Sequence, residues 1–65
     1  MKVKSVEELQ YMSEELQRAY VEKCSDYWVK KYEDAGKTWD KMTPEEKEEE
    51  EKLRDIFRYA RINLD

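Results

Sequence analysis

The side chains that could do chemistry in this chain are mainly carboxylates, guanidinium groups and one thiol. It has 17 acidic and 13 basic residues, a single cysteine and no histidine. Histidine is the usual general acid or base near neutral pH, so the thiol of Cys24 has no imidazole to activate it. Cys24 also falls in the middle of a predicted helix, where we expect it to pack as a small apolar side chain.

Other catalytic and ligand-holding arrangements lack their residues as well. A glycine-rich phosphate loop needs several glycines, and this chain has only Gly36. No spacing typical of zinc ligands is present. Carboxylates become catalytic in a cleft that perturbs their pKa values, and two or three short helices rarely enclose one. We therefore expect no enzymatic activity, no cofactor and no metal site.

The densest charged segment is a glutamate run after Pro44, consisting of Glu45, Glu46, Glu48, Glu49, Glu50 and Glu51. In helical projection Glu46, Glu49 and Glu50 fall on the same side as Leu53 and Phe57. The first two turns of this helix are thus expected to have no buried face and to form an acidic prong. Two interpretations follow. Charge runs are usually solvated and compensate the helix dipole; alternatively, Glu48, Glu49 and Glu50 contact a basic protein surface.

Three arginines, Arg54, Arg58 and Arg61, line one side of the same helix. Guanidinium groups at this spacing suit phosphates or carboxylates. The structural alternative is dipole compensation together with a Glu50–Arg54 pair at i, i+4.

A group of apolar and aromatic residues forms a patch about a quarter-turn from the main apolar stripe of the preceding helix. It consists of Val21, Trp28, Val29 and Tyr32. Aromatic side chains outside a core are common interface anchors, so the patch predicts a protein partner or a second copy of the chain. The alternative is that a short middle turn with Trp39 folds over the patch and completes one core.

The elements that position these groups are predicted from caps and periodicity. Ser5 and Glu8 form a capping box that opens a helix of about residues 6–35, and Gly36 is suited to a left-handed C-terminal cap. A bend at Ser13 or Ser25 is left open, since each serine can cap a new helix. The core-facing stripe of this helix is Val6, Leu9, Met12, Leu16, Ala19, Tyr20, Cys24 and Tyr27.

A second helix of about residues 44–62 begins at Thr43-Pro44-Glu45-Glu46, which combines an N-cap, a proline at the first helical position and a glutamate at N3. Its apolar side is Leu53, Ile56, Phe57, Ala60 and Leu64. The connector is short enough to join antiparallel helices. We expect Trp39 to anchor it by packing against both helices, with Thr38 capping a short middle turn.

The predicted fold is a single all-α domain, residues 1–65, built as an antiparallel helical hairpin. A domain this small buries only about 60% of its unfolded surface, so a homodimer is one way to stabilise it. The longest apolar run is Tyr27-Trp28-Val29, too short for a membrane span. The lone thiol fits a reducing cytoplasm, and the net charge of −4 weighs against general DNA binding.

The stretch of residues 39–47 resembles the junction between the second and third helices of HMG-box domains. Its pattern of Trp39, Met42, Thr43, an acidic pair and Lys47 is similar to theirs. After Lys47 those domains usually carry an aromatic residue, whereas this chain carries glutamates, and no basic first helix is evident. We therefore transfer neither the family nor DNA bending to this chain.

The sequence thus favours a small cytoplasmic protein-interaction module. We expect a regulator or inhibitor that binds a larger protein through the aromatic patch, the acidic helix end or both, as accessory proteins of bacteria and their viruses do. The alternative is a nucleic-acid-binding module that uses the Arg54/Arg58/Arg61 face, whose affinity would fall steeply with salt. A purely structural oligomerising helix pair is a third interpretation, for which the heptad spacing is poor.

Overall fold

The computed structural model describes residues 2–64, and all regular structure within them is helical. In chain order the elements are α1 (Val6–Gln10), α2 (Glu14–Trp28), a π-helical turn (Val29–Glu33), a short 3-10 turn (Trp39–Lys41) and α3 (Pro44–Asn63). The predicted all-α class is therefore confirmed. No helix in this part of the chain is long and apolar enough to cross a membrane.

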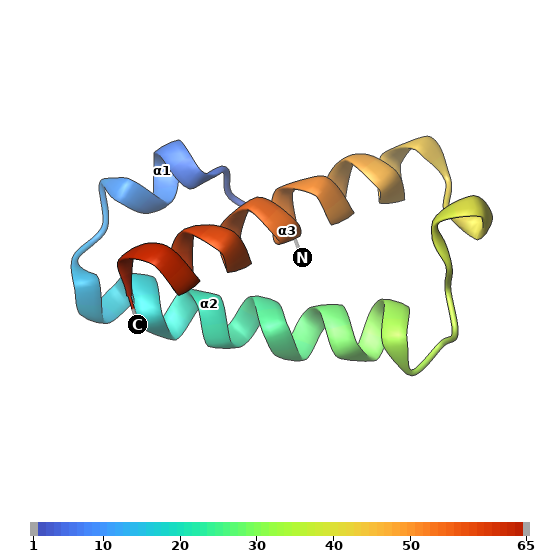
Figure 1. The fold of residues 1–65 in the computed structure, drawn as a ribbon, viewed down its shortest axis with the longest axis horizontal. Helices are drawn as coiled ribbons and strands as arrows, with labels where there is room; N and C mark the ends of the chain where they lie inside the picture. The colour runs from blue at the N-terminus through green and yellow to red at the C-terminus, as the bar shows by residue number, and fades with distance from the viewer. Residues whose placement is uncertain (1, 65) are drawn as a thin grey trace.

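The predicted first helix is interrupted after α1, so a continuous helix over residues 6–35 is wrong. Ser5 caps α1, accepting from the Glu8 amide at 3.3 Å. The break falls at Ser13, whose extended backbone and side chain, accepting from the Leu16 amide at 3.3 Å, start α2. The alternative of a bend at Ser13 is thus confirmed, whereas Ser25 lies inside α2. The break allows α1 to turn back and lie against α3 (Figure 1).

The end of α2 differs from an ordinary helix end because it continues directly into the π-helical turn. The Asp34 amide donates to the Val29 carbonyl at 2.8 Å, an i→i+5 bond. Because a π turn takes up one more residue than an α turn, it brings Tyr32 round toward the side of Tyr27. Gly36 then stops the helix with a φ of 65°, as predicted.

The start of α3 agrees with the prediction in every part. The Glu46 amide donates to Thr43 Oγ1 at 3.2 Å, and the Thr43 amide donates to Glu46 Oε1 at 3.1 Å. Pro44 occupies the first helical turn. These two reciprocal bonds satisfy amides that a helix N-terminus otherwise leaves unpaired.

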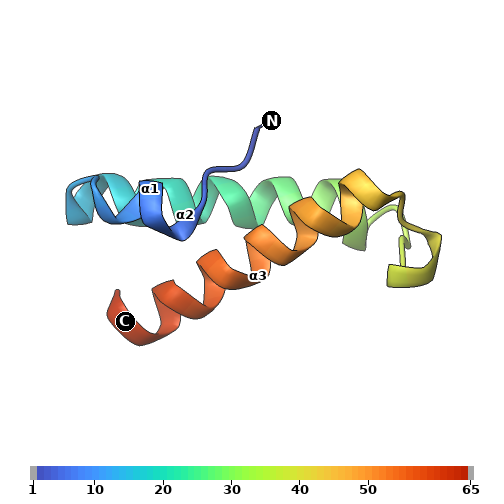
Figure 2. The same cartoon turned by 90° about the horizontal axis from the view of Figure 1, so that it is seen from above.

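The core lies where the three α-helices meet. α2 and α3 run in opposite chain directions, and their axes cross at a clear angle (Figures 1 and 2). A polar contact ties them near the C-terminal end of α3: Tyr59 Oη donates to Gln17 Oε1 at 3.0 Å, and buried Gln17 Nε2 donates to the Met12 carbonyl at 2.9 Å. The largest fully buried side chains are Tyr32, Leu9, Leu53, Ile56 and Cys24. Of the predicted apolar stripe, Leu16 and Ala19 are instead exposed.

The connector does not bury its tryptophan. Trp39 begins the 3-10 turn and is 42% exposed, so the expectation that it packs between both helices is wrong. Its ring lies beside two cations of α3, with Lys47 Nζ 5.4 Å and Arg54 Cζ 6.0 Å from the ring centroid. The 3-10 turn projects at one end of the molecule, and the α1–α2 junction lies at the opposite end (Figure 1).

Candidate functional site

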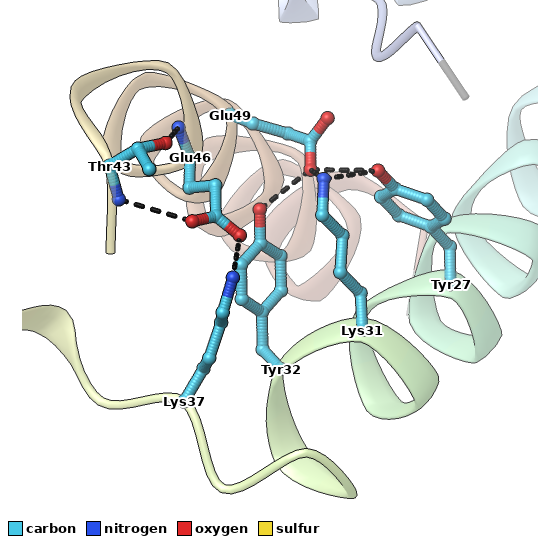
Figure 3. A network of polar contacts seen from close by, with 7 residues as sticks. All are labelled: Tyr27, Lys31, Tyr32, Lys37, Thr43, Glu46 and Glu49. Carbon is cyan, nitrogen blue, oxygen red and sulfur yellow. Dashed lines mark hydrogen bonds and ion pairs between the residues drawn. The ribbon is translucent and has the colours of Figure 1, made fainter. Parts of the chain in front are cut away.

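A network of polar side chains is centred on Glu49, which points from α3 toward α2 and the π-helical turn (Figure 3). Its Oε1 accepts from Tyr32 Oη at 2.7 Å, Tyr27 Oη at 2.9 Å and Lys31 Nζ at 3.0 Å. Lys31 Nζ also donates to Tyr27 Oη at 3.0 Å. One carboxylate oxygen therefore collects three donors from one turn and a half of helix.

These contacts shift the pKa values of Glu49, Tyr32 and Lys31. Burial opposes the charged form of Glu49, but the hydrogen bonds from Tyr32, Lys31 and Tyr27 outweigh it and lower its pKa. Burial and the bond to Glu49 raise the pKa of Tyr32. The pKa of Lys31 is raised by its bonds to Tyr27 and Glu49. At neutral pH Glu49 is thus a carboxylate, Lys31 is an ammonium and the phenol of Tyr32 is neutral.

A second ion pair ties the connector to the start of α3. Lys37 Nζ donates to Glu46 Oε2, while the other oxygen of Glu46 belongs to the capping box with Thr43 (Figure 3). The bond from Lys37 and the bond from the Thr43 amide lower the pKa of Glu46. Glu46 thereby positions both the helix N-terminus and the connector that carries Trp39.

Glu50 is the most deeply buried carboxylate among the described residues, at 3% exposed. Its Oε1 accepts from the Trp28 indole N–H at 3.2 Å. Arg54 Nε lies 2.9 Å from Oε2 as an ion pair, yet its N–H is not aligned with that oxygen. Oε2 accordingly accepts no hydrogen bond from residues 2–64. Arg54 is thus the cation that compensates this buried oxygen, and removing it without a replacement would be costly.

The acidic prong is therefore not present as predicted. Glu49 and Glu50 turn inward to meet donors from α2 and the π-helical turn, and only Glu48 of the predicted triplet is exposed. The expectation that these turns have no buried face is wrong, because a helix face can be buried by hydrogen-bond donors as well as by apolar side chains. The matching signal was present in the preceding helix, as the donors Tyr27, Trp28, Lys31 and Tyr32.

The predicted aromatic patch is likewise divided. Tyr32 is 1% exposed and belongs to the core, because the π-helical turn carries it inward. Val21 and Trp28 are half-buried and pack against the core, and Val29 is half-buried. Most of this patch therefore packs in or against the core, but the alternative in which the middle turn with Trp39 covers the patch is met only in part, because Trp39 itself is 42% exposed.

The three arginines are all exposed. Arg54 lies between the Glu50 carboxylate and the Trp39 ring. Arg58 and Arg61 lie on later turns of α3, beyond this ion pair. The thiol of Cys24 is fully buried, and burial raises its pKa, which agrees with the expected packing role.

One of the hollows on the surface lies beside the connector, and we name it the tryptophan hollow. Its volume is about 390 Å³, within the range of small-molecule sites. Half-buried Trp28 and exposed Trp39 contribute aromatic surface, and Glu50 and Arg54 contribute charge. Its lining includes Trp28, Trp39, Met42, Glu50, Arg54 and Lys37. Sequence reasoning missed this site because it placed Trp39 in the core.

Among residues 2–64 no group of three or more His, Cys, Asp or Glu side chains is arranged to hold a metal ion. The chain matches no protein-family model, and comparison with curated proteins and with solved structures finds no match either.

Proposed function

We propose that this chain is a small protein-interaction module that regulates or inhibits a larger protein by binding it through the tryptophan hollow. The observation that carries the proposal is Trp39, 42% exposed at the rim of a hollow of about 390 Å³. Tryptophan dominates the binding energy of many interfaces when it enters a partner's surface. Holding it on a connector that is tied to α3 reduces the entropy lost on binding.

The proposal shifts the binding surface from the one that the sequence favoured. Tyr32 and Glu49 bond to each other within the chain, and the Trp28 indole holds the Glu50 carboxylate where it lines the hollow. Outside the hollow, any acidic contribution to binding falls to exposed glutamates such as Glu48. In this proposal α2 and α3 form an antiparallel helical hairpin that acts as a scaffold, and no catalytic step is assigned.

The proposed place of action is the cytoplasm, where a free thiol such as that of Cys24 persists.

A second copy of the chain is the other protein partner to test. Self-association is favoured by the exposed apolar side chains of Leu16 and Ile62. Sedimentation velocity across a concentration series measures it directly: a mass that rises with concentration supports a homodimer, and a constant monomer mass excludes it.

The test of the main proposal compares three baits in a cytoplasmic lysate treated with nuclease: the wild type, Trp39→Ala and Tyr11→Ala. Tyr11 is a matched control because it is 93% exposed and lies at the α1–α2 junction, at the opposite end of the molecule. We expect one near-stoichiometric protein to be retained by the wild type and by Tyr11→Ala, and lost with Trp39→Ala. Equal retention by all three baits would refute the proposal.

Nucleic-acid binding is the second candidate function, and one observation favours it. An exposed indole with Lys47 and Arg54 beside its ring has the chemistry of a base-stacking platform next to phosphate-binding cations. Arg58 and Arg61 would extend that basic surface along α3. The net charge of −4 opposes it. Affinity for single-stranded oligonucleotides that falls steeply with salt would support this candidate, and no binding at low salt would remove it.

A further inference from the structure

We propose that the tryptophan hollow receives a cationic side chain of the partner protein, an arginine or a lysine. This inference rests on the proposed function, because it names the chemical group that the hollow recognises. It is carried by the buried carboxylate of Glu50, the two indole rings and the position of Arg54.

The carboxylate of Glu50 supplies the polar half of the site. It is 3% exposed and lines the hollow, and its Oε2 accepts no hydrogen bond from the described residues. Trp28 donates to the other oxygen and so holds the carboxylate in place. A guanidinium or ammonium group that enters the hollow can donate to Oε2, forming a charge-assisted hydrogen bond at a site already desolvated. Glu33 adds a second carboxylate to the lining.

The indole rings supply the apolar half. Tryptophan has the strongest cation–π attraction of the aromatic side chains, and the Trp39 ring already has cations at 5.4 and 6.0 Å from its centroid. The stem of an arginine or lysine would lie against Trp28 and Met42, which line the same hollow.

Arg54 shows the mode of binding within the chain itself. Its guanidinium lies between the Trp39 ring and the Glu50 carboxylate, the place that a partner's cation would take. The Arg54 side chain is 66% exposed, so it can swing outward when another cation takes its place beside Glu50. Lys37, the other cation of the lining, is neutralised by Glu46. Arg54 is therefore an internal competitor, and removing its charge should strengthen cation binding, whereas it would weaken binding of a phosphate.

The experiment titrates the full chain with N-acetyl-arginine N-methylamide and follows the two indole N–H signals by ¹H–¹⁵N NMR. The neutral isostere N-acetyl-citrulline N-methylamide is the control ligand. We expect saturable shifts of the Trp28 and Trp39 signals with the arginine probe alone. Arg54→Gln should bind it about threefold more tightly, and Glu50→Gln about tenfold more weakly. Thermal unfolding of each variant checks the fold, and exposed Arg54 keeps the test valid if Glu50→Gln unfolds.

The inference is overturned if citrulline shifts the signals as arginine does, if Arg54→Gln weakens arginine binding, or if the arginine probe fails to bind. Uridine monophosphate is titrated in parallel, and shifts of Trp39 that Arg54→Gln abolishes would assign the hollow to a nucleotide instead. A failure of this inference can be told apart from a failure of the proposed function. If Trp39→Ala loses the protein partner while the probe does not bind, the binding surface stands and its cation specificity is wrong.

Discussion

Tyr32 in the π-helical turn after α2 donates its hydroxyl to Glu49 on α3 at 2.7 Å, although the two lie 17 positions apart in the chain. The contact depends on the π-helical turn, since a regular α-helix would carry Tyr32 further round the helix axis. It places a phenol in the core and a carboxylate at its edge. The base of the tryptophan hollow is built on this part of the molecule, because Tyr32 also lines the hollow.

Replacing Tyr32 by Phe should destabilise the fold, because Glu49 loses one of three donors while the ring remains packed. We expect the free energy of unfolding to fall by about 1 to 2 kcal/mol. Urea denaturation followed by circular dichroism measures the change. Tyr11→Phe is the matched control, because Tyr11 is exposed and should show no loss. Equal stability of the two variants would mean that the Tyr32–Glu49 bond contributes nothing.

Stability should also depend on pH through Glu49. Its pKa in the folded state is lowered from the ordinary value of 4.5, with burial opposing and the bonds from Tyr32, Lys31 and Tyr27 outweighing it. A lowered folded-state pKa contributes stability that is present above the unfolded value and is lost as pH falls through the folded one. Wild-type stability should therefore fall as pH drops below about 4.5, and Glu49→Gln should flatten this dependence. An unchanged acid profile in Glu49→Gln would contradict the assignment. Glu46, whose pKa is lowered by Lys37, adds a component that Glu49→Gln leaves intact.

The helix boundaries were largely predictable because capping is a local interaction. Ser5, Gly36 and Thr43 act where the sequence placed them, and Ser13 was one of two positions foreseen for a break. The π-helical turn was not predictable from periodicity, which assumes one constant rotation per residue. That single change of register moved Tyr32 from a surface patch into the core.

The candidate site was less predictable, because it depends on pairing between distant polar residues. Helical projection puts Glu49 and Glu50 on the same side as Leu53, but a glutamate run is usually solvated, so their residue type argued against burial. The signal for buried glutamates lay in the phenol, indole and ammonium donors of the preceding helix. It can be interpreted only once α2 and α3 are known to face one another. The position of Trp39 was predicted wrongly from the general rule that an indole in a short connector is buried. In the structure its ring lies beside two cations of α3 instead.

The break between α1 and α2 gives a prediction about Ser13. Ser13→Ala should destabilise the chain by about 1 kcal/mol, because the Leu16 amide loses its capping acceptor. Ser25→Ala is the control, since Ser25 is exposed within α2 and alanine is a better helix former there. Thermal unfolding should rank Ser13→Ala below the wild type and Ser25→Ala at or above it. The reverse order would favour a continuous first helix.

The contact between Tyr59 and Gln17 should matter for the pairing of α2 with α3. Tyr59→Phe removes the donor to buried Gln17 Oε1 and should cost about 1 kcal/mol in the free energy of unfolding. Hydrogen exchange should show faster opening in the first turns of α2. If protection there is unchanged, the two helices are held together without this bond.

The most direct test of the central claim is the affinity of the captured partner for Trp39→Ala and Tyr11→Ala, measured by isothermal titration calorimetry on proteins of verified fold. We predict that Trp39→Ala weakens binding at least about tenfold, as expected for a tryptophan that dominates an interface, and that Tyr11→Ala binds like the wild type. Wild-type affinity in Trp39→Ala would show that the tryptophan hollow is not the binding surface.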